Sequence, residues 1–163
     1  MDAVKTGRVL KNLEMMLQCE NAVTAFYQTC AKAWPRERVF WSDLAAGSLL
    51  RYTRLQLMQP RAENSESAAD SIRVFHPGAL TTFRAWVESS RVRVHSGEIG
   101  MRGGLALARD LERSPIVNEQ YLVTRRTDPE LADYLLSFAT DYGEQTKRIE
   151  ARLGESFATA KVA

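Results

Sequence analysis

Apolar residues recur at three- and four-residue steps along most of the chain, which is the spacing of one face of an α-helix. A first long apolar stripe predicts a helix over about residues 5–34. Pro35 ends that helix and is well placed in the first turn of the next, because proline has no amide hydrogen to donate within a helix. A second stripe predicts a helix over about residues 36–59, and Pro60 is expected to stop it.

The middle of the chain changes character twice. Residues 61–72 are polar and rich in turn-forming residues, so they predict a surface loop. The turn signal His76-Pro77-Gly78 is followed by a pattern that predicts a helix over about residues 79–95. The stretch RVRV in this segment also alternates as a strand does, but the length of the apolar pattern favours a helix.

Two more helices are predicted in the last third of the chain, over about residues 100–124 and 129–153. Pro115 falls inside the first and is expected to kink or bulge it just after Glu112, because it removes one backbone hydrogen bond. The second begins with the sequence TDPE, which combines a cap, a first-turn proline and an acid at the positive end of the helix dipole. The tail over 154–163 is expected to be frayed.

These elements define an all-α chain with a single domain over residues 1–163. Short turns join the helices in two pairs, so the members of each pair are expected to be antiparallel neighbours. The roughly 40-residue link between the pairs is long enough to cross the molecule from end to end, and it carries the extra helix 79–95. We therefore predict an antiparallel four-helix bundle with one long crossover connection.

The second helix pair repeats features of the first. A shift of 94 residues takes Pro35 to Pro129, and a shift of 92 takes Glu20 to Glu112. Each pair thus combines a helix that carries a glutamate on its inward face with a helix that starts at a proline. In one known architecture, this repetition builds a site for two metal ions.

The composition restricts the class of protein. Hydrophobic content of 45% with 26% charged residues is typical of a soluble globular protein, and a net charge of +2 is too small to indicate a nucleic-acid or membrane partner. No apolar run is long enough to span a bilayer, and the first residues lack the features of a signal peptide. Cys19 and Cys30 would lie roughly 16 Å apart on one helix, too far for a disulfide, and two reduced thiols fit a cytoplasmic protein.

Four stretches of sequence carry a resemblance to a known family. CENAVTAFYQTCAKAW followed by PRERVFWSDLAAGSLLRY is similar to the first helical hairpin of rubrerythrin-like proteins. GEIGMRGGLALARDLERS and then TDPELADYLLSFATDYGEQ are similar to the second. The resemblance covers about residues 10–150 and is to the short branch, since no CxxC pair is present to bind a further iron. It implies a ferritin-like fold, which in the family holds two irons that reduce peroxide or oxidise ferrous ions.

In the family, the metal site takes inward carboxylates from all four helices, and the resemblance assigns two of them here. Glu20 occupies the first-helix position, with Tyr27 seven residues later as in the family, and Glu112 occupies the third-helix position. Asp141 and Glu144 are nearby acids on the last helix, and at least one of them is expected to lie off the inward face.

The other family ligands are replaced. On the second and fourth helices the family has a histidine three residues after a glutamate, a spacing at which both side chains reach the same metal pair. The second helix has Ser48 and Arg51 at these positions, and the fourth has Tyr142 and Gln145. Both bridging carboxylates and both histidines are therefore missing, and a permanently charged guanidinium at a histidine position would repel a dication.

We therefore hypothesise a core without metal or another cofactor, held by an ion network of Glu20, Arg51 and Glu112. Three of the altered positions would satisfy the remaining donors and acceptors: Ser48, Tyr142 and Gln145. Other interpretations stay open. In one, the two glutamates are ordinary polar positions, and in another the arginine turns outward. In a third, metal is bound, either as one ion on the two glutamates or as iron at ligands that this assignment misses.

Three functions follow from these interpretations. The first is a non-catalytic ferritin-like protein that serves as a binding, scaffold or regulatory module, with an unidentified protein or small molecule as its partner. The second is a rubrerythrin-like di-iron oxidoreductase. The third is a bundle that binds an organic ligand in the space vacated by metal, since Gly47, Ser48 and Gly143 are small. Rubrerythrin-like proteins commonly dimerise, so we expect a homodimer through apolar residues such as Phe26 or Trp41.

Overall fold

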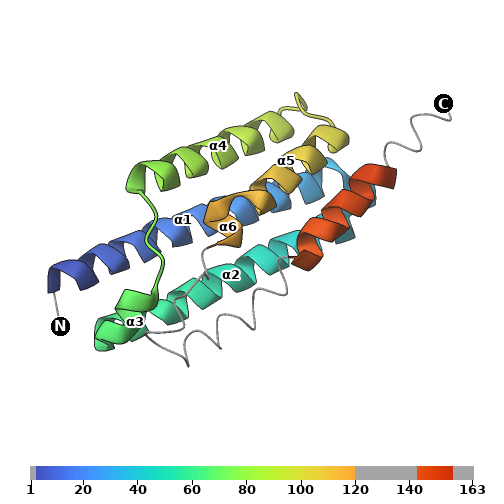
Figure 1. Ribbon diagram of the computed structural model, residues 1–163. Coiled ribbons are helices and arrows are strands. Elements are labelled where there is room, and N and C mark those ends of the chain that lie inside the picture. Colours follow the sequence, from blue (N-terminus) through green and yellow to red (C-terminus); the bar gives the residue numbers. More distant parts are fainter. Residues whose placement is uncertain (1–2, 120–142, 156–163) are drawn as a thin grey trace.

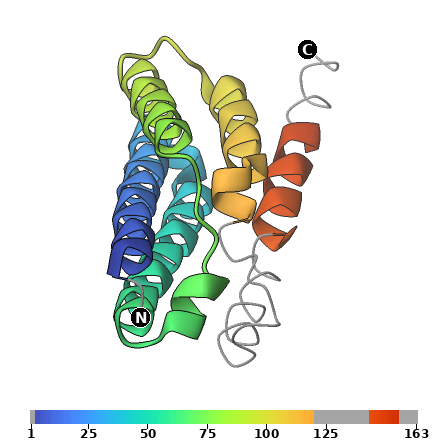
Figure 2. The ribbon, with the colours of Figure 1, turned by 60° about the vertical axis from the view of Figure 1, so that its left-hand side comes forward.

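The computed structural model describes residues 3–119 and 143–155, and every regular element in these two ranges is helical (Figure 1). The first helix, α1, spans Ala3–Ala33 and is followed by a short 3-10 turn, η1, over Pro35–Glu37. The second helix, α2, spans Arg38–Asn64 and runs back along α1 in the opposite direction (Figures 1 and 2). The predicted all-α class is thus confirmed for the described residues.

The turn between α1 and α2 forms where the sequence predicts it. Trp34 N donates to Cys30 O over 2.9 Å and completes the end of α1. Pro35 then takes the first position of η1, where no amide hydrogen is required. Because proline disfavours the helical conformation in the residue before it, Trp34 leaves the helix with a ψ of 77° and the chain turns back.

The predicted stop of α2 at Pro60 is wrong, because the helix continues through this residue to Asn64. Pro60 lies close to the end of α2 and on its exposed side, so its ring displaces no packed neighbour. The Asn64 side chain donates to Pro60 O over 2.6 Å and satisfies one carbonyl near the helix end. Proline prevents the hydrogen bond from its own nitrogen, but not those accepted by its carbonyl.

Residues 61–72 do not form the predicted surface loop. They complete α2 and then form a short helix, α3, over Glu66–Ser71. Ser65 caps α3, since its side chain accepts a hydrogen bond from Ala68 N, and an acid follows in the first turn. Ala68 is buried although the segment is polar overall, so a small apolar face fixes the helix against its neighbours.

The predicted helix 79–95 is confirmed as α4, which spans Pro77–His95 and packs along α1. Its buried positions follow the helical repeat: Leu80, Phe83, Val87, Ser90 and Val94. The segment that leads into α4 is tied to α1 by a reciprocal pair of hydrogen bonds. Asn12 Nδ2 donates to Phe75 O over 2.7 Å, and Phe75 N donates to Asn12 Oδ1 over 3.1 Å.

The predicted continuous helix over 100–124 is wrong. The chain forms α5 over Met101–Arg113 and a single-turn helix, α6, over Pro115–Asn118. Ser114 between them is extended, with φ −61° and ψ 135°, because a proline disfavours the helical conformation of the residue before it. The disturbance lies close to its predicted position but is a complete break, and residues 120–124 lie outside the described ranges.

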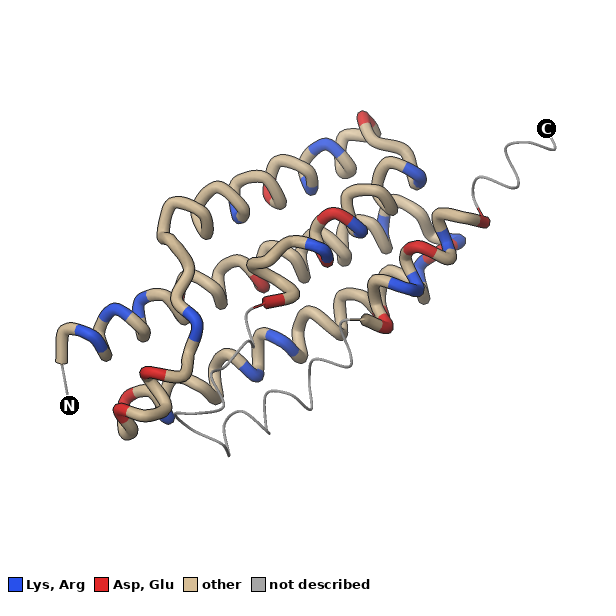
Figure 3. Tube along the Cα trace, in the orientation of Figure 1, with Lys and Arg blue, Asp and Glu red and all other residues tan. Residues whose placement is uncertain are grey.

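The last described segment, 143–155, is helical and carries both acidic and basic residues along its length (Figure 3). Arg148 joins it to α2 through Asp43, with 3.0 Å between the charged atoms. Of the helix predicted over 129–153, residues 129–142 lie outside the described ranges. Gly154 does not begin the expected tail, because the helix extends through 155.

The two residues expected to form a dimer surface, Phe26 and Trp41, are buried instead, with 1% and 0% of their surfaces exposed. Trp41 belongs to an aromatic cluster, with ring centroids 6.2 Å from Tyr27 and 5.3 Å from Trp34. Packing around the α1–α2 turn therefore buries these side chains. The periodicity of the sequence alone does not decide whether they are buried or exposed. Among the described helices, none is both as long and as apolar as a membrane-spanning segment has to be.

Candidate functional site

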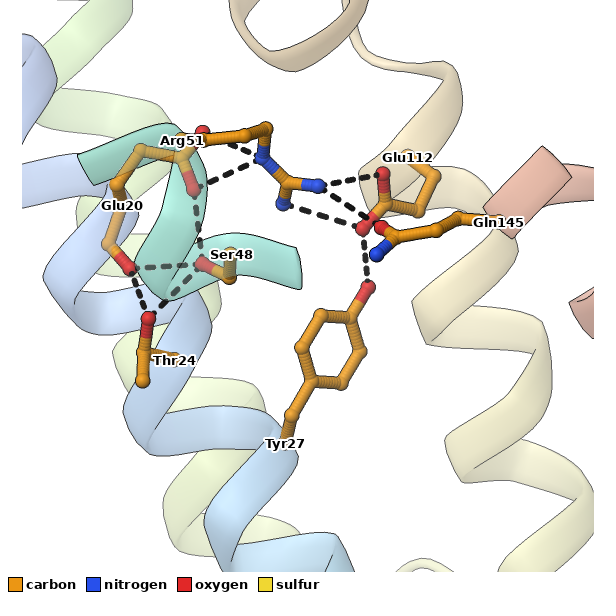
Figure 4. Close-up of polar contacts among 7 residues, drawn as sticks. All are labelled: Glu20, Thr24, Tyr27, Ser48, Arg51, Glu112 and Gln145. Atoms are coloured by element: carbon orange, nitrogen blue, oxygen red, sulfur yellow. Dashed lines mark hydrogen bonds and ion pairs between the residues drawn. The ribbon is translucent and has the colours of Figure 1, made fainter. Parts of the chain in front are cut away.

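Side chains from α1, α2, α5 and segment 143–155 meet in one buried polar network (Figure 4). At its centre, the guanidinium of Arg51 on α2 lies between the carboxylates of Glu20 on α1 and Glu112 on α5. These residues are 3%, 2% and 1% exposed, respectively. Water and salt therefore screen their charges far less than they screen charges at the surface.

Arg51 contacts the two carboxylates through different edges of its guanidinium. Nε donates to both oxygens of Glu20, over 3.0 and 3.1 Å. Nη1 and Nη2 each donate to one oxygen of Glu112, over 3.3 and 3.2 Å. The planar fork of arginine suits such an arrangement between two carboxylates, and the predicted contacts of Arg51 with both glutamates are present.

The helical repeat places the partners of this network on common faces. Glu20, Thr24 and Tyr27 follow one another at steps of four and three residues on α1, so their side chains point to the same side. Ser48 and Arg51 are three residues apart on α2 and share a face in the same way. The spacing that would suit a glutamate and a histidine in the family here presents a hydroxyl and a guanidinium.

Two hydroxyl groups complete the surroundings of Glu20. Ser48 Oγ donates to Glu20 Oε2 over 2.8 Å, and Thr24 Oγ1 lies 2.9 Å from Ser48 Oγ. Thr24 Oγ1 also lies 3.0 Å from the backbone oxygen of Glu20, one helical turn earlier. Thr24 was not among the predicted site residues, although its position four residues after Glu20 is a signal that could have identified it.

Tyr27 stabilises the second carboxylate. Its hydroxyl donates to Glu112 Oε1 over 2.6 Å, so the tyrosine expected near the site is part of it. Burial, followed by the charge of Glu112, raises the pKa of Tyr27 well above its usual value, so the phenol is a neutral donor. Burial also raises the pKa of Glu112, while Arg51 and the Tyr27 hydrogen bond oppose that rise.

Gln145 closes the network from segment 143–155. Its Oε1 accepts a hydrogen bond from Arg51 Nη1 over 2.9 Å. Its amide lies directly against Gly47, since a Cβ at that position would be 1.7 Å from Gln145 Nε2. Part of the space expected to be empty beside Gly47 is therefore filled by this side chain. A cavity of about 220 Å³ adjoins it, with these lining residues: Gly47, Leu50, Arg51, Arg54, Glu144, Gln145 and Arg148.

The remaining predicted site residues that the structure describes, Gly143 and Glu144, make no hydrogen bond or ion pair with this network. Tyr142 and Asp141 lie outside the described residues. Glu144 is exposed, its carboxylate lies 3.8 Å from the ammonium group of Lys147, and it lines the adjoining cavity. Gly143 is also exposed and has no other atom close to its Cβ position.

The described side chains do not fit a di-iron centre. Such a centre needs about six carboxylate and imidazole ligands, whereas residues 3–119 and 143–155 bring no three His, Cys, Asp or Glu side chains together. The carboxylates of Glu20 and Glu112 both accept hydrogen bonds from Arg51. A dication at this point would meet a guanidinium that stays charged at every accessible pH.

No family model matches the chain, and searches of curated proteins and of solved structures give no match either. What the site does is therefore inferred from its geometry and from the sequence motifs described above. In chemical terms, the hydrogen-bond donors and acceptors of this network are bonded to one another. It holds four parts of the chain together through one buried cation.

Proposed function

We propose that this protein is a ferritin-like helical bundle whose di-iron site has been replaced by an arginine-centred network, and that it serves as a non-catalytic binding, scaffold or regulatory protein. The observation that carries the proposal is the position of Arg51, bonded to both Glu20 and Glu112 in the core. These are the two carboxylates that the rubrerythrin-like resemblance assigns to the metal site.

The directions of the helices support the ferritin-like assignment. α1 and α2 form an antiparallel pair, and α4 then runs along α1 in the same direction as α1, before α5 and segment 143–155 follow (Figures 1 and 2). A crossover helix between two helix pairs is the connection expected for this fold. The network also draws one or more side chains from each of α1, α2, α5 and 143–155, as the family's site does.

The charge balance supports a role without metal chemistry. A di-iron centre would supply several positive charges to the carboxylates, whereas here one guanidinium supplies a single charge and five N–H donors. Because Arg51 already donates to oxygens of both glutamates, these carboxylates have a counter-ion without a metal ion. The oxidoreductase interpretation would require ligands that the described residues do not provide.

A second candidate function, binding of a small organic molecule, is favoured by one observation. The cavity of about 220 Å³ lies directly beside the network and shares Arg51 and Gln145 with it. Its walls carry three arginine side chains, so it is not the closed apolar space that an apolar ligand would need. A thermal shift produced by small polar molecules and abolished by a Leu50→Trp substitution in the cavity wall would support this second function.

Elemental analysis tests the main proposal. The protein would be produced with and without added iron, and the metal content per chain and the melting temperature with and without chelator would be measured. We expect no stoichiometric iron and an unchanged melting temperature in chelator. Two irons per chain, or a large loss of stability in chelator, would overturn the proposal and return peroxide or ferrous-iron chemistry to first place.

A further inference from the structure

The outward side of α1 lacks acidic residues over its second half. Between Met15 and Ala33 the only acid is Glu20, which is buried in the polar network. The positions that remain exposed or half-exposed on one stripe of this helix are amides, small residues and a lysine: Gln18, Asn21, Ala25, Gln28, Thr29 and Lys32. Solvated helix faces usually mix both charges, so this composition is unusual.

Three surface hollows adjoin one another along this stripe. The first, of about 630 Å³, lies between α1 and α4 and includes Gln18 and Arg91. The second, of about 440 Å³, shares Arg91 with the first and also includes Lys32. The third, of about 580 Å³, shares Lys32 with the second and reaches Arg38 and Ser42 on α2. We call these three hollows the groove: they follow the outward side of α1 for roughly 20 Å, the first two towards α4 and the third towards α2, with Lys32 between the second and the third.

The groove is basic. Lys32, Arg38 and Arg91 line it and make no ion pair with any other residue in the described ranges. The single acid in its lining, Glu88, lies 3.6 Å from Arg84 of the same helix. The charged residues of α4 are mostly basic (Figure 3). The positive charge at this groove is therefore not balanced by neighbouring side chains.

We propose that this groove binds an acidic peptide segment of a partner protein. The inference rests on the proposed binding or scaffold function and names the chemistry of the partner. The elongated shape suits a peptide, the amides of Asn21 and Gln28 can hydrogen-bond to its backbone, and the cations complement its carboxylates. A net charge of only +2 gives the chain little of the long-range attraction that nucleic acids exploit.

The test is fluorescence anisotropy of a labelled octaglutamate peptide at low salt. The groove variant carries Lys32→Glu and Arg91→Glu. The matched control carries Arg8→Glu and Lys11→Glu, which make the same change of charge at exposed positions near the other end of α1. We expect saturable binding by the wild type, about tenfold or greater weakening in the groove variant, and little change in the control.

Three results would overturn the proposal: no saturable binding by the wild type, equal weakening in both variants, or tighter binding of a single-stranded oligonucleotide of equal length. Circular dichroism establishes that each variant is folded. A milder pair, Lys32→Gln with Arg91→Gln, replaces the groove variant if charge reversal prevents folding. The elemental analysis tests the Arg51 network, whereas the peptide experiment tests the groove. A failed peptide experiment would therefore exclude an acidic peptide as the partner without affecting the interpretation of Arg51.

Discussion

Replacing Arg51 by methionine is the sharpest test of the buried network. Methionine keeps much of the aliphatic stem but removes the charge and every donor. Glu20 and Glu112 would then be left in the core, at most 2% exposed, without the guanidinium that now lies within 3.3 Å of both carboxylates. Removing one partner of a buried ion pair typically costs about 3–5 kcal/mol of folding free energy, because the remaining charge stays desolvated.

Protonation limits that cost and makes it depend on pH. A carboxyl group with an ordinary pKa of about 4.3 can be neutralised at pH 7 for about 3.7 kcal/mol, and at pH 5 for about 1 kcal/mol. Burial already raises the pKa of Glu112, and Arg51 opposes that rise, so the Arg51→Met variant should raise it further. A carboxyl group whose pKa is raised by folding stabilises the folded state at pH values below its unfolded-state pKa. That stabilisation is lost as the pH rises through the folded-state pKa. We therefore expect a loss of about 4 kcal/mol at pH 7 that shrinks towards pH 5.

Urea denaturation at both pH values measures this effect, with tryptophan fluorescence as the signal. Arg148→Met is the matched control, since its ion pair with Asp43 is partly exposed and should contribute less than about 1 kcal/mol. Adding Glu20→Gln and Glu112→Gln to the Arg51→Met variant should recover much of the lost stability. A loss below about 1 kcal/mol at pH 7, or one of equal size at both pH values, would refute the reasoning.

Two further predictions concern the edges of the network and the thiols. Gly47→Ala should displace the Gln145 side chain, which then loses its hydrogen bond to Arg51, at a cost of about 1–3 kcal/mol of folding free energy. The same substitution in a Gln145→Ala background should cost little, because that bond is already absent. Thermal denaturation of the wild type, the two single variants and the double variant checks this. Burial raises the pKa of Cys19 to about 12 and also raises that of Cys30, so both should react with a disulfide reagent at pH 8 far more slowly in the native than in the unfolded protein. Rapid labelling of either native thiol would contradict this.

The sequence predicts the long helices well because their apolar periodicity is clear. The helix predicted over 79–95 lies within α4, and the turn at Pro35 lies where proline and the residue before it require it. The errors occur where a local signal competes with packing. Pro60 is tolerated near the exposed end of α2, whereas Pro115 divides the helix because Ser114 adopts an extended conformation.

The candidate site is predicted in part because residue spacing determines which side chains share a helix face. The contacts of Arg51 with Glu20 and Glu112 follow from such spacing. Periodicity does not reveal how the space between helices is filled. The placement of Gln145 against Gly47 depends on the distance between two segments that are far apart in the sequence, so the cavity expected there could not be assessed in advance.

The exchange of a metal pair for a guanidinium, which we propose here, changes how the core depends on its surroundings. A metal site is complete only when the ion is supplied, and its ligands repel one another when it is absent. Arg51 is part of the chain and stays charged, so Glu20 and Glu112 have their counter-ion as soon as the chain folds. Because this cation is a guanidinium and not a metal ion, it has no exchangeable ligand. It therefore cannot serve as a Lewis acid or a redox centre. A protein with this core is therefore suited to presenting a stable surface, such as the basic groove along α1.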